Sequence, residues 1–225
     1  MKEIIYKDLG LISYAEAWDL QEKLFEEIIH AKTSSPPSAS ANYLLFCEHP
    51  HVYTLGKSGS DANLLVNEEM LKQKGAGFFR TNRGGDITYH GPGQIVGYPI
   101  LDLEVFGLGI REYIGLLEES VIMLLRDHDI ESSRLQGASG VWLSPGDPQK
   151  ARKICAIGVR SSRYVTMHGF AFNVNTDLDF YSFINPCGFT DKGVTSMKKE
   201  LGSDQDFTLV KHGLKEILLK LLRTP

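Results

Sequence analysis

The stretch Arg83-Gly-Gly-Asp-Ile-Thr-Tyr-His-Gly-Pro-Gly-Gln94 holds five Gly or Pro residues among twelve. Between them lie a cation, a carboxylate, a hydroxyl and an imidazole, on Arg83, Asp86, Thr88 and His90. Glycine at this density is typical of backbone that passes close to another group or takes positive φ. Gly and Pro also mark ordinary turns, so a tight loop between two strands is the alternative interpretation.

Short apolar runs on both sides of this stretch predict β-strands. Residues 78–80 lead into it and residues 95–101 follow it. Upstream, residues 43–47 form a continuous apolar run typical of a buried strand, and residues 52–55 form a second one. Because proline cannot donate to a sheet ladder, Pro99 should lie on an edge strand or near the end of its own strand.

Helical periodicity and N-cap residues predict four helices. Ser13 and Glu16 form a capping box ahead of apolar residues at helical spacing. Asn67 and Asp206 are expected to cap two of the other helices. The predicted helices cover residues 14–31, 68–74, 109–127 and 207–222.

A β-hairpin is predicted downstream, where residues 141–143 and 153–160 are apolar runs joined by a Pro/Gly-rich turn. Residues 164–174 form a further predicted strand with a glycine inside it. The Pro/Ser-rich segment 33–41 can bury little apolar surface, so we expect a mobile loop there. Helices combined with hairpin-joined strands indicate a single α+β domain over residues 1–225, with helices packed on mainly antiparallel or mixed β-sheets.

The composition is that of a globular protein. Charged residues make up 23% of the 225 residues and hydrophobic residues 42%, and the net charge is −4. The acidic balance argues against a general nucleic-acid binder, and no apolar run approaches the ~18–20 residues of a membrane span. The start of the chain shows no signal-peptide pattern, and three widely spaced cysteines fit a reduced, cytoplasmic protein.

Positive charge is concentrated in one part of this acidic chain. Between residues 150 and 199 there are eight Lys or Arg residues and three Asp residues, an excess of five positive charges. Scattered solvated lysines are one interpretation, and a basic face that attracts an acidic partner is the other. The cations are Lys150, Arg152, Lys153, Arg160, Arg163, Lys192, Lys198 and Lys199.

Cys187 is a candidate nucleophile. It lies in the sequence Asn185-Pro-Cys-Gly-Phe, where Pro and Gly fix the chain around an accessible sulfur, whereas Cys47 and Cys155 have apolar neighbours typical of buried cysteine. A nucleophilic thiol needs a base or a cation that favours its thiolate. The candidates are one lysine at the start of an apolar strand and several histidines, namely Lys153, His49, His51, His90 and His168.

A metal centre and a nucleotide-binding loop are both disfavoured. The histidines and cysteines show neither Cys-x-x-Cys nor His-Glu-x-x-His spacing. The pair His49-Pro-His51 is more typical of a hydrogen-bonded turn than of a metal site. The chain also lacks a Gly-x-x-x-x-Gly-Lys-Ser/Thr motif, so we expect no metal and no bound cofactor.

Together these motifs resemble those of the lipoyl(octanoyl) transferase family. The stretch 83–94, followed by Tyr98-Pro99, is similar to the family signature. Further blocks match in the same order, namely Glu48-His-Pro-His-Val-Tyr-Thr-Leu-Gly56, Lys153-Ile-Cys-Ala-Ile-Gly158, His168-Gly-Phe-Ala-Phe-Asn-Val174 and Asn185-Pro-Cys-Gly188. The resemblance implies the fold of biotin and lipoate ligases.

The resemblance also implies an enzyme that moves an octanoyl group from acyl carrier protein to a lysine of a lipoyl domain, through a cysteine thioester. The acceptors would be lipoyl domains of 2-oxoacid dehydrogenase complexes and the glycine cleavage H protein. By position, Cys187 resembles the nucleophile and Lys153 the residue that activates it. The acyl group would contact Arg83, Gly84, Gly85, Asp86, Ile87, Thr88, Tyr89, His90, Ala156, Ile157, Gly158, Gly169, Phe170 and Ala171.

Three alternatives remain open on the sequence alone. An ATP-dependent lipoate–protein ligase of the same fold would form an adenylate and would need no cysteine. A cysteine hydrolase would pair Cys187 with His168 or His90, and a non-catalytic acyl-binding module would not need Cys187 and Lys153 together. Cys155 would compete as a nucleophile only if it were exposed, and we expect it to be buried.

Overall fold

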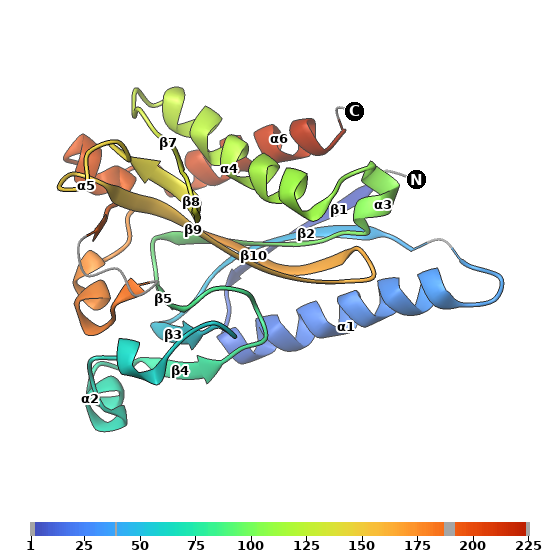
Figure 1. Cartoon of the computed structure of the whole chain (residues 1–225), viewed down its shortest axis with the longest axis horizontal. Coiled ribbons are helices and arrows are strands. Elements are labelled where there is room, and N and C mark those ends of the chain that lie inside the picture. Colours follow the sequence, from blue (N-terminus) through green and yellow to red (C-terminus); the bar gives the residue numbers. More distant parts are fainter. Residues whose placement is uncertain (1–2, 39, 187–191, 224–225) are drawn as a thin grey trace.

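A computed structural model describes residues 3–38, 40–186 and 192–223, and it contains two β-sheets (Figure 1). The strands of the large sheet are β1 (Ile4–Leu11), β2 (Asn42–Glu48), β6 (Gln94–Ile100), β7 (Ser133–Leu135), β8 (Ala138–Leu143), β9 (Arg152–Ser162), β10 (Val165–Asn173) and β11 (Gly193–Val194). The strands of the small sheet are β3 (Val52–Leu55), β4 (Gly77–Arg80) and β5 (Ile87–His90).

Helices cover both faces of the large sheet. They are α1 (Tyr14–Thr33), α2 (Glu68–Gln73), α3 (Leu103–Phe106), α4 (Ile110–Arg126), α5 (Met197–Leu201) and α6 (Phe207–Arg223), with the 3₁₀ helices η1 (Asp61–Asn63) and η2 (Leu178–Phe183). α4 and α6 lie on one face, and α1 lies on the other (Figure 1). This is the predicted α+β architecture.

The large sheet has the strand order β1-β2-β6-β10-β9-β8-β7, and β11 pairs with β9. Most of its pairs are antiparallel, whereas β1–β2 and β9–β11 are parallel. Its central strands read as continuous apolar runs because both of their faces are buried. In β2, Leu44 and Phe46 pack under α4 and α6, and the alternate residues Leu45 and Cys47 pack under α1.

β6 is an interior strand between β2 and β10, so the edge position suggested by Pro99 is wrong. The other possibility, that Pro99 lies near the end of its strand, is confirmed. The β6–β10 ladder stops at Gly97 opposite Phe170, so no backbone donor is needed from Pro99 toward β10. The Pro99 carbonyl accepts a hydrogen bond from the Thr166 hydroxyl at 2.9 Å instead.

The predicted caps are confirmed. The Ser13 hydroxyl accepts from the Glu16 N–H at 3.3 Å and donates to the Glu16 carboxylate at 2.6 Å, which is the capping box of α1. Asn67 and Asp206 accept from the third residue after each, at 2.9 and 3.0 Å. β1 was not predicted, because it is an edge strand whose burial follows no regular alternation.

The small sheet carries the Gly-rich stretch over the large sheet. Residues 87–90 of that stretch form β5, which pairs antiparallel with β3, so the loops in the stretch are confined to residues 83–86 and to the turn at 91–93 before β6. The sheet has its own core of Tyr53, Leu55, Ile87 and Tyr89, against which η2 packs. With this core of its own, the small sheet can hold the Gly-rich loop at residues 83–86 in a fixed position over the large sheet.

Candidate active site

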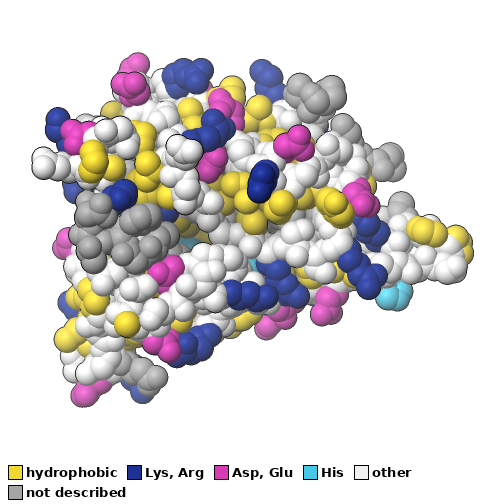
Figure 2. All heavy atoms as spheres, in the orientation of Figure 1, with side chains coloured by type: hydrophobic (Ala, Val, Ile, Leu, Met, Phe, Trp, Pro, Cys, Tyr) yellow, Lys and Arg dark blue, Asp and Glu magenta, His cyan; other side chains and the backbone are white. Residues whose placement is uncertain are grey.

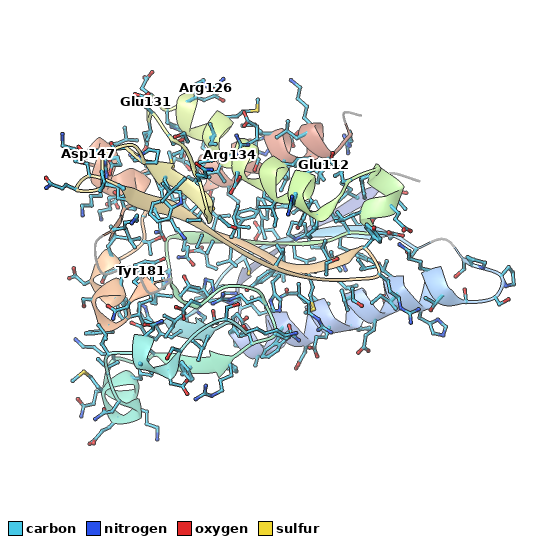
Figure 3. All side chains as sticks on the ribbon, in the orientation of Figure 1. Glu112, Arg126, Glu131, Arg134, Asp147 and Tyr181 are labelled. Atoms are coloured by element: carbon cyan, nitrogen blue, oxygen red, sulfur yellow. The ribbon has the colours of Figure 1, made fainter. Side chains whose placement is uncertain are left out.

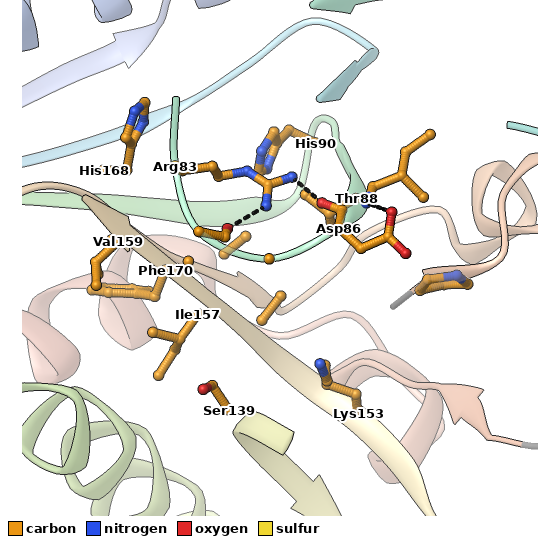
Figure 4. A pocket seen from close by; sticks show the side chains of 18 of the residues that line it. Arg83, Asp86, Thr88, His90, Ser139, Lys153, Ile157, Val159, His168 and Phe170 are labelled. Carbon is orange, nitrogen blue, oxygen red and sulfur yellow. Dashed lines mark hydrogen bonds between the residues drawn. The ribbon is translucent and has the colours of Figure 1, made fainter. Parts of the chain in front are cut away.

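A cavity of about 420 Å³ lies between the large sheet and the loop that leads into β5 (Figure 4). β9 and β10 supply one wall, and residues 83–88 supply the facing wall. In Figure 4, Lys153 lies at one end of the view and His168 at the other. The sequence-predicted residues that line the cavity are Lys153, Arg83, Gly84, Gly85, Asp86, Ile87, Thr88, His90, Ala156, Ile157, Gly158, Gly169, Phe170 and Ala171.

Among the described residues, Tyr89 is the predicted site residue that does not line this cavity. Its ring is fully buried in the small sheet and stacks on Phe180, with ring centroids 5.0 Å apart. Its hydroxyl forms a hydrogen bond with His51 Nδ1 at 2.7 Å. Side chains alternate along a strand, so with Thr88 and His90 at the cavity, Tyr89 faces the opposite side of β5.

Arg83 holds the loop wall in place. Its side chain is 7% exposed and donates to the main-chain carbonyls of Thr54 at 2.7 Å, Asp86 at 2.7 Å and Gly84 at 3.0 Å. We call these hydrogen bonds the Arg83 latch. The Gly84 N–H donates to the Val159 carbonyl at 2.9 Å, which ties the loop to β9. Charge-assisted hydrogen bonds are about twice as strong as neutral ones, so the latch makes this wall rigid.

Gly158 allows the loop to approach β9 closely. A Cβ at this position would lie 2.9 Å from the Gly84 carbonyl oxygen and 3.3 Å from Arg83 Cδ. One of these neighbours is main chain and the other belongs to the Arg83 latch, so neither can move away easily. The glycine in β9 is therefore required by the loop that faces it.

Replacing Gly158 with alanine is expected to destabilise the fold by about 1–3 kcal/mol, the usual cost of overpacking. Urea unfolding measures this effect. Gly146→Ala is the matched control, since no atom lies within 4 Å of a Cβ added there. Equal behaviour of the two variants would contradict the close approach of the loop.

Lys153 lines the cavity from the start of β9 and is 8% exposed. Its main-chain carbonyl accepts from the Thr195 N–H at 2.9 Å. Cys187 lies outside the described residues, but Pro186, which precedes it in the chain, lines the same cavity as Lys153. The structure thus brings Lys153 and the start of the Pro186-Cys187 motif to one site.

The other two cysteines are buried, as predicted. Cys47 is 2% exposed and Cys155 is fully buried. Burial raises the pKa of both thiols, which disfavours the reactive thiolate. Burial therefore disfavours Cys155 as a nucleophile, although it follows Lys153 by two residues.

Buried histidines gather near the His168 end of the cavity. His90 Nδ1 forms a hydrogen bond with Gln94 Oε1 at 2.9 Å, and His168 Nε2 forms one with Asn82 Oδ1 at 2.7 Å. His168 takes a φ of 57°, and no described residue provides a partner for its Nδ1. This end of the cavity thus has a buried polar atom behind its wall with no partner among the described residues.

Lowering the pH from 7 to 5 is expected to destabilise the protein. Burial lowers the pKa of His90 and His168 to about 3 and that of His49 to about 4, against about 6.5 in an unfolded chain. At pH values between the folded and unfolded pKa of a histidine, the unfolded chain binds more protons than the folded protein. The free energy of unfolding therefore decreases by ~1.4 kcal/mol for each histidine and each unit by which the pH is lowered in that range.

Urea midpoints at pH 7 and pH 5 measure this dependence. A His49→Gln variant should show a weaker dependence, because it removes one of the three neutral histidines. A wild-type midpoint that does not change between the two pH values would show that these histidines are not held neutral by burial.

A buried polar network beside the cavity was missed from the sequence. Gln94 Nε2 donates to Asn173 Oδ1 at 2.8 Å, and Asn173 Nδ2 donates to the Thr195 carbonyl at 3.0 Å. The Tyr181 hydroxyl lies 3.2 Å from Gln94 Nε2, and Tyr181 comes from η2 (Figure 3). Gln94 at the start of the apolar strand β6 and Asn173 at the end of the apolar strand β10 were the available signal.

The excess charge between residues 150 and 199 is partly neutralised by acids from outside that segment. Arg152 pairs with Glu200 at 2.5 Å, and Lys198 pairs with Asp204 at 2.8 Å. On the face shown in Figure 2, Lys and Arg side chains lie among Asp and Glu side chains. Counting charges only over residues 150–199 therefore overstated the local positive charge, because the acids that pair with these cations in the fold lie outside that range of the sequence.

The sequence disfavours both a metal centre and a membrane span. In the described part of the chain, no group of three or more His, Cys, Asp or Glu residues is arranged to hold a metal ion. None of the helices described is both long and apolar enough to cross a bilayer.

The motifs and the cavity agree with a known family. A family model described as the lipoyl protein ligase A/B catalytic domain matches residues 13–218. The chain belongs to this family. The octanoyltransferase of Parabacteroides distasonis is 56% identical over 221 residues, covering 98% of this chain and 99% of that protein. The octanoyltransferase of Bacteroides fragilis is 56% identical over 219 residues, covering 97% and 98%. The resemblance read from the motifs is confirmed.

Solved structures of distant relatives show the same fold. A bipartite lipoate protein ligase from Thermoplasma acidophilum matches with a TM-score of 0.71 at 18% identity, covering 98% of this chain and 84% of that one. Lipoate-protein ligase A bound with ATP matches with 0.66 at 17%, covering 98% and 85%. Biotin protein ligase from Aquifex aeolicus matches with 0.51 at 15%, covering 98% and 69%. The predicted biotin/lipoate ligase fold is confirmed.

Proposed function

We propose that this protein transfers an octanoyl group from octanoyl-acyl carrier protein to a lysine of a lipoyl domain, through a thioester on Cys187. The observation that carries this proposal is the 56% identity, over almost the whole chain, to proteins named octanoyltransferase. The acyl acceptors would include the lipoyl domains of 2-oxoacid dehydrogenase complexes and the glycine cleavage H protein. A reduced cytoplasmic setting suits an enzyme that depends on a thiol.

The cavity is suited to an acyl chain. Ile157, Val159 and Phe170 give its sheet wall an apolar surface, and the opposing loop is fixed by the Arg83 latch. Burial of apolar groups contributes about 0.8 kcal/mol per methylene, so the six methylenes of an octanoyl chain offer roughly 5 kcal/mol. A rigid slot of this kind holds the carbonyl of the thioester near Lys153.

In the first step, Lys153 accepts the proton of the Cys187 thiol, and the thiolate attacks the carbonyl carbon of the octanoyl thioester. The bond between that carbon and the sulfur of the carrier protein breaks as the tetrahedral intermediate collapses. Lys153 then returns the proton to the departing thiolate. One thioester replaces another, so the step is nearly isoenergetic and needs no ATP.

In the second step, the amine of the acceptor lysine attacks the Cys187 thioester. Lys153 accepts a proton from the attacking amine and passes it to the Cys187 sulfur as the carbon–sulfur bond breaks. The products are an amide and a free thiol. Because an amide is more stable than a thioester, this step drives the transfer forward.

The oxyanion formed in both steps needs hydrogen-bond donors, and β9 offers one. The Val159 carbonyl faces the loop, since it accepts from the Gly84 N–H. Main-chain groups two residues apart in a strand point the same way, so the Ile157 N–H also faces the cavity side and the Gly158 N–H faces β10. We therefore assign the donor in β9 to Ile157, and a donor of this kind contributes roughly 3–4 kcal/mol to lowering the barrier.

The test is transfer without ATP. Octanoyl-acyl carrier protein and an unmodified lipoyl domain are incubated with the enzyme, and the intact mass of the lipoyl domain should rise by one octanoyl group. Free octanoate with ATP should give no product in the parallel reaction. The opposite pattern would identify an ATP-dependent ligase, and release of free octanoate would identify a hydrolase.

A further inference from the structure

Trp142 is a buried aromatic residue directly behind Lys153. The Lys153 Nζ lies 4.7 Å from the centroid of the Trp142 ring. The tryptophan is 1% exposed and, unlike Lys153, is not among the residues that line the cavity. The pair thus has one member at the cavity wall and one member in the core behind it.

A β-bulge places these two residues opposite each other. In the β8–β9 pair, Val141 faces Cys155, and the next residue of β8, Trp142, faces Lys153. A regular antiparallel ladder would place Trp142 opposite Ile154 instead, because one step forward on β8 is one step back on β9. The extra residue Ile154 therefore brings Lys153 onto the same face as Trp142, as bulges beside active sites do when they redirect a side chain.

The surroundings fix the ring. Trp142 Nε1 donates to the Ala138 carbonyl at 3.3 Å. Gly140 has a φ of +115°, and a Cβ at Gly140 would overlap the carbonyl oxygen of Cys155 and lie 3.6 Å from Lys153 Cδ. The two strands thus approach closely at this point, and the stem of Lys153 passes beside Gly140.

We propose that Trp142 is a positioning residue for the acyl-transfer step, one that holds the Lys153 ammonium at the cavity wall. This inference rests on the role given to Lys153 in the proposed function. The face of an indole ring attracts a cation, and the attraction is stronger where water is excluded. Burial by itself penalises a charged group, so the ring offsets part of that penalty without neutralising the ammonium as a carboxylate would.

Other charged groups face this region from the neighbouring elements. Glu118 of α4 accepts from the Gly140 N–H at 3.0 Å and from Arg134 at 2.9 Å. Glu200 of α5 is paired with Arg152, the residue before Lys153. Both carboxylates are engaged by arginines. The remaining titratable neighbours are Cys155, two residues further along β9, and Lys192, which precedes the strand β11 that pairs with Arg152 and Lys153.

An indole ring attracts the Lys153 ammonium but not the neutral amine, so a pH profile separates a role in positioning the cation from a role in packing. The thiolate–ammonium pair of the first step is lost at high pH when the ammonium loses its proton. Without the ring this loss should occur at lower pH, whereas the protonation of the thiolate at low pH should be little changed. The alkaline side of the pH profile is therefore the side that reports on Trp142.

The experiment compares Trp142→Leu, Trp142→Phe and wild type. The rate of acyl-enzyme formation from octanoyl-acyl carrier protein is measured between pH 5 and 10 by rapid quench and intact mass. Trp142→Leu should lower the maximal rate roughly 2- to 30-fold and move the alkaline limb down by roughly 0.3–1.5 pH units, the range that cation–π energies imply. Trp142→Phe should lie between Trp142→Leu and wild type, and KM should change little.

Phe106→Leu is the control for lost packing, since it also removes a buried ring from the core but lies on α3. It should lower stability and leave both limbs of the profile in place. A folded Trp142→Leu with a wild-type profile would overturn the proposal. So would a Trp142→Leu profile that matches that of Phe106→Leu.

A second measurement separates this proposal from the proposed function. The rate at which acetic anhydride modifies Lys153 is followed against pH by peptide mass spectrometry in wild type and Trp142→Leu. The labelling profile should move to lower pH in the variant, whether or not Cys187 is acylated. An unchanged labelling profile overturns the role of Trp142, whereas a wild type that forms no acyl-enzyme overturns the proposed function instead.

Discussion

Cys187→Ala is expected to abolish the octanoyl adduct and to lower transfer to the lipoyl domain at least a thousandfold, since removing a covalent nucleophile commonly costs three orders of magnitude or more. The physical reason is that no other described thiol can replace it. Cys47 and Cys155 are buried, and burial raises the pKa of both. Intact mass after incubation with octanoyl-acyl carrier protein measures the adduct, and hydroxylamine should remove it from the wild type.

Cys155→Ala is the matched control for that experiment. It removes a thiol two residues from Lys153 and should leave the adduct and its lability to hydroxylamine in place. A normal adduct in Cys187→Ala would exclude Cys187 as the nucleophile. Loss of the adduct in Cys155→Ala, in a variant that remains folded, would transfer the role to Cys155.

Lys153→Met should lower the rate of acyl-enzyme formation by roughly 10²–10⁴-fold, the usual contribution of a general acid–base residue. Methionine keeps most of the apolar stem, so the packing against Trp142 is retained while the amine is lost. Lys153→Arg should be almost as slow, because a guanidinium keeps the charge but does not give up its proton. Single-turnover kinetics measure both variants.

Lys150→Met is the control for Lys153. Lys150 is exposed and lies 3.5 Å from Asp147 in the turn between β8 and β9, so its loss should change the transfer rate by less than about twofold. Wild-type rates in Lys153→Arg would mean that a fixed positive charge is sufficient and that proton transfer is not the role of this residue. Wild-type rates in Lys153→Met would remove Lys153 from the mechanism.

Much of the fold could be predicted because local signals agree with it. The capping box at Ser13 and Glu16 places the start of α1, and the apolar runs of β2 and β6 mark strands buried on both faces. The edge strand β1 lacked such a pattern, since only part of it is covered. The position of Pro99 depended on where the β6–β10 ladder stops, which no local signal reveals.

The candidate site could be predicted as a set of motifs, and its geometry could not. The motif residues Arg83 and Gly158 meet because the small sheet lies over β9, which is a long-range arrangement. Tyr89 was included with its neighbours because a motif does not show on which face of a strand a side chain lies. The bulge at Ile154, which sets Trp142 opposite Lys153, depends on the register of two strands and leaves no mark in the sequence.

The Arg83 latch has a consequence for how this enzyme class can diversify. The carbonyls that it grips on Thr54, Gly84 and Asp86 belong to the backbone, and every residue type carries one. The side chain at position 88 can therefore be exchanged through mutation while the curvature of the loop is inherited unchanged, whereas Asp86 is held by hydrogen bonds with Asn63 and the Ile87 N–H, and Ile87 is held in the core of the small sheet. Enzymes of this class that act on shorter, longer or more polar acyl donors can therefore differ in the side chain that the loop presents to the cavity while keeping the same loop backbone.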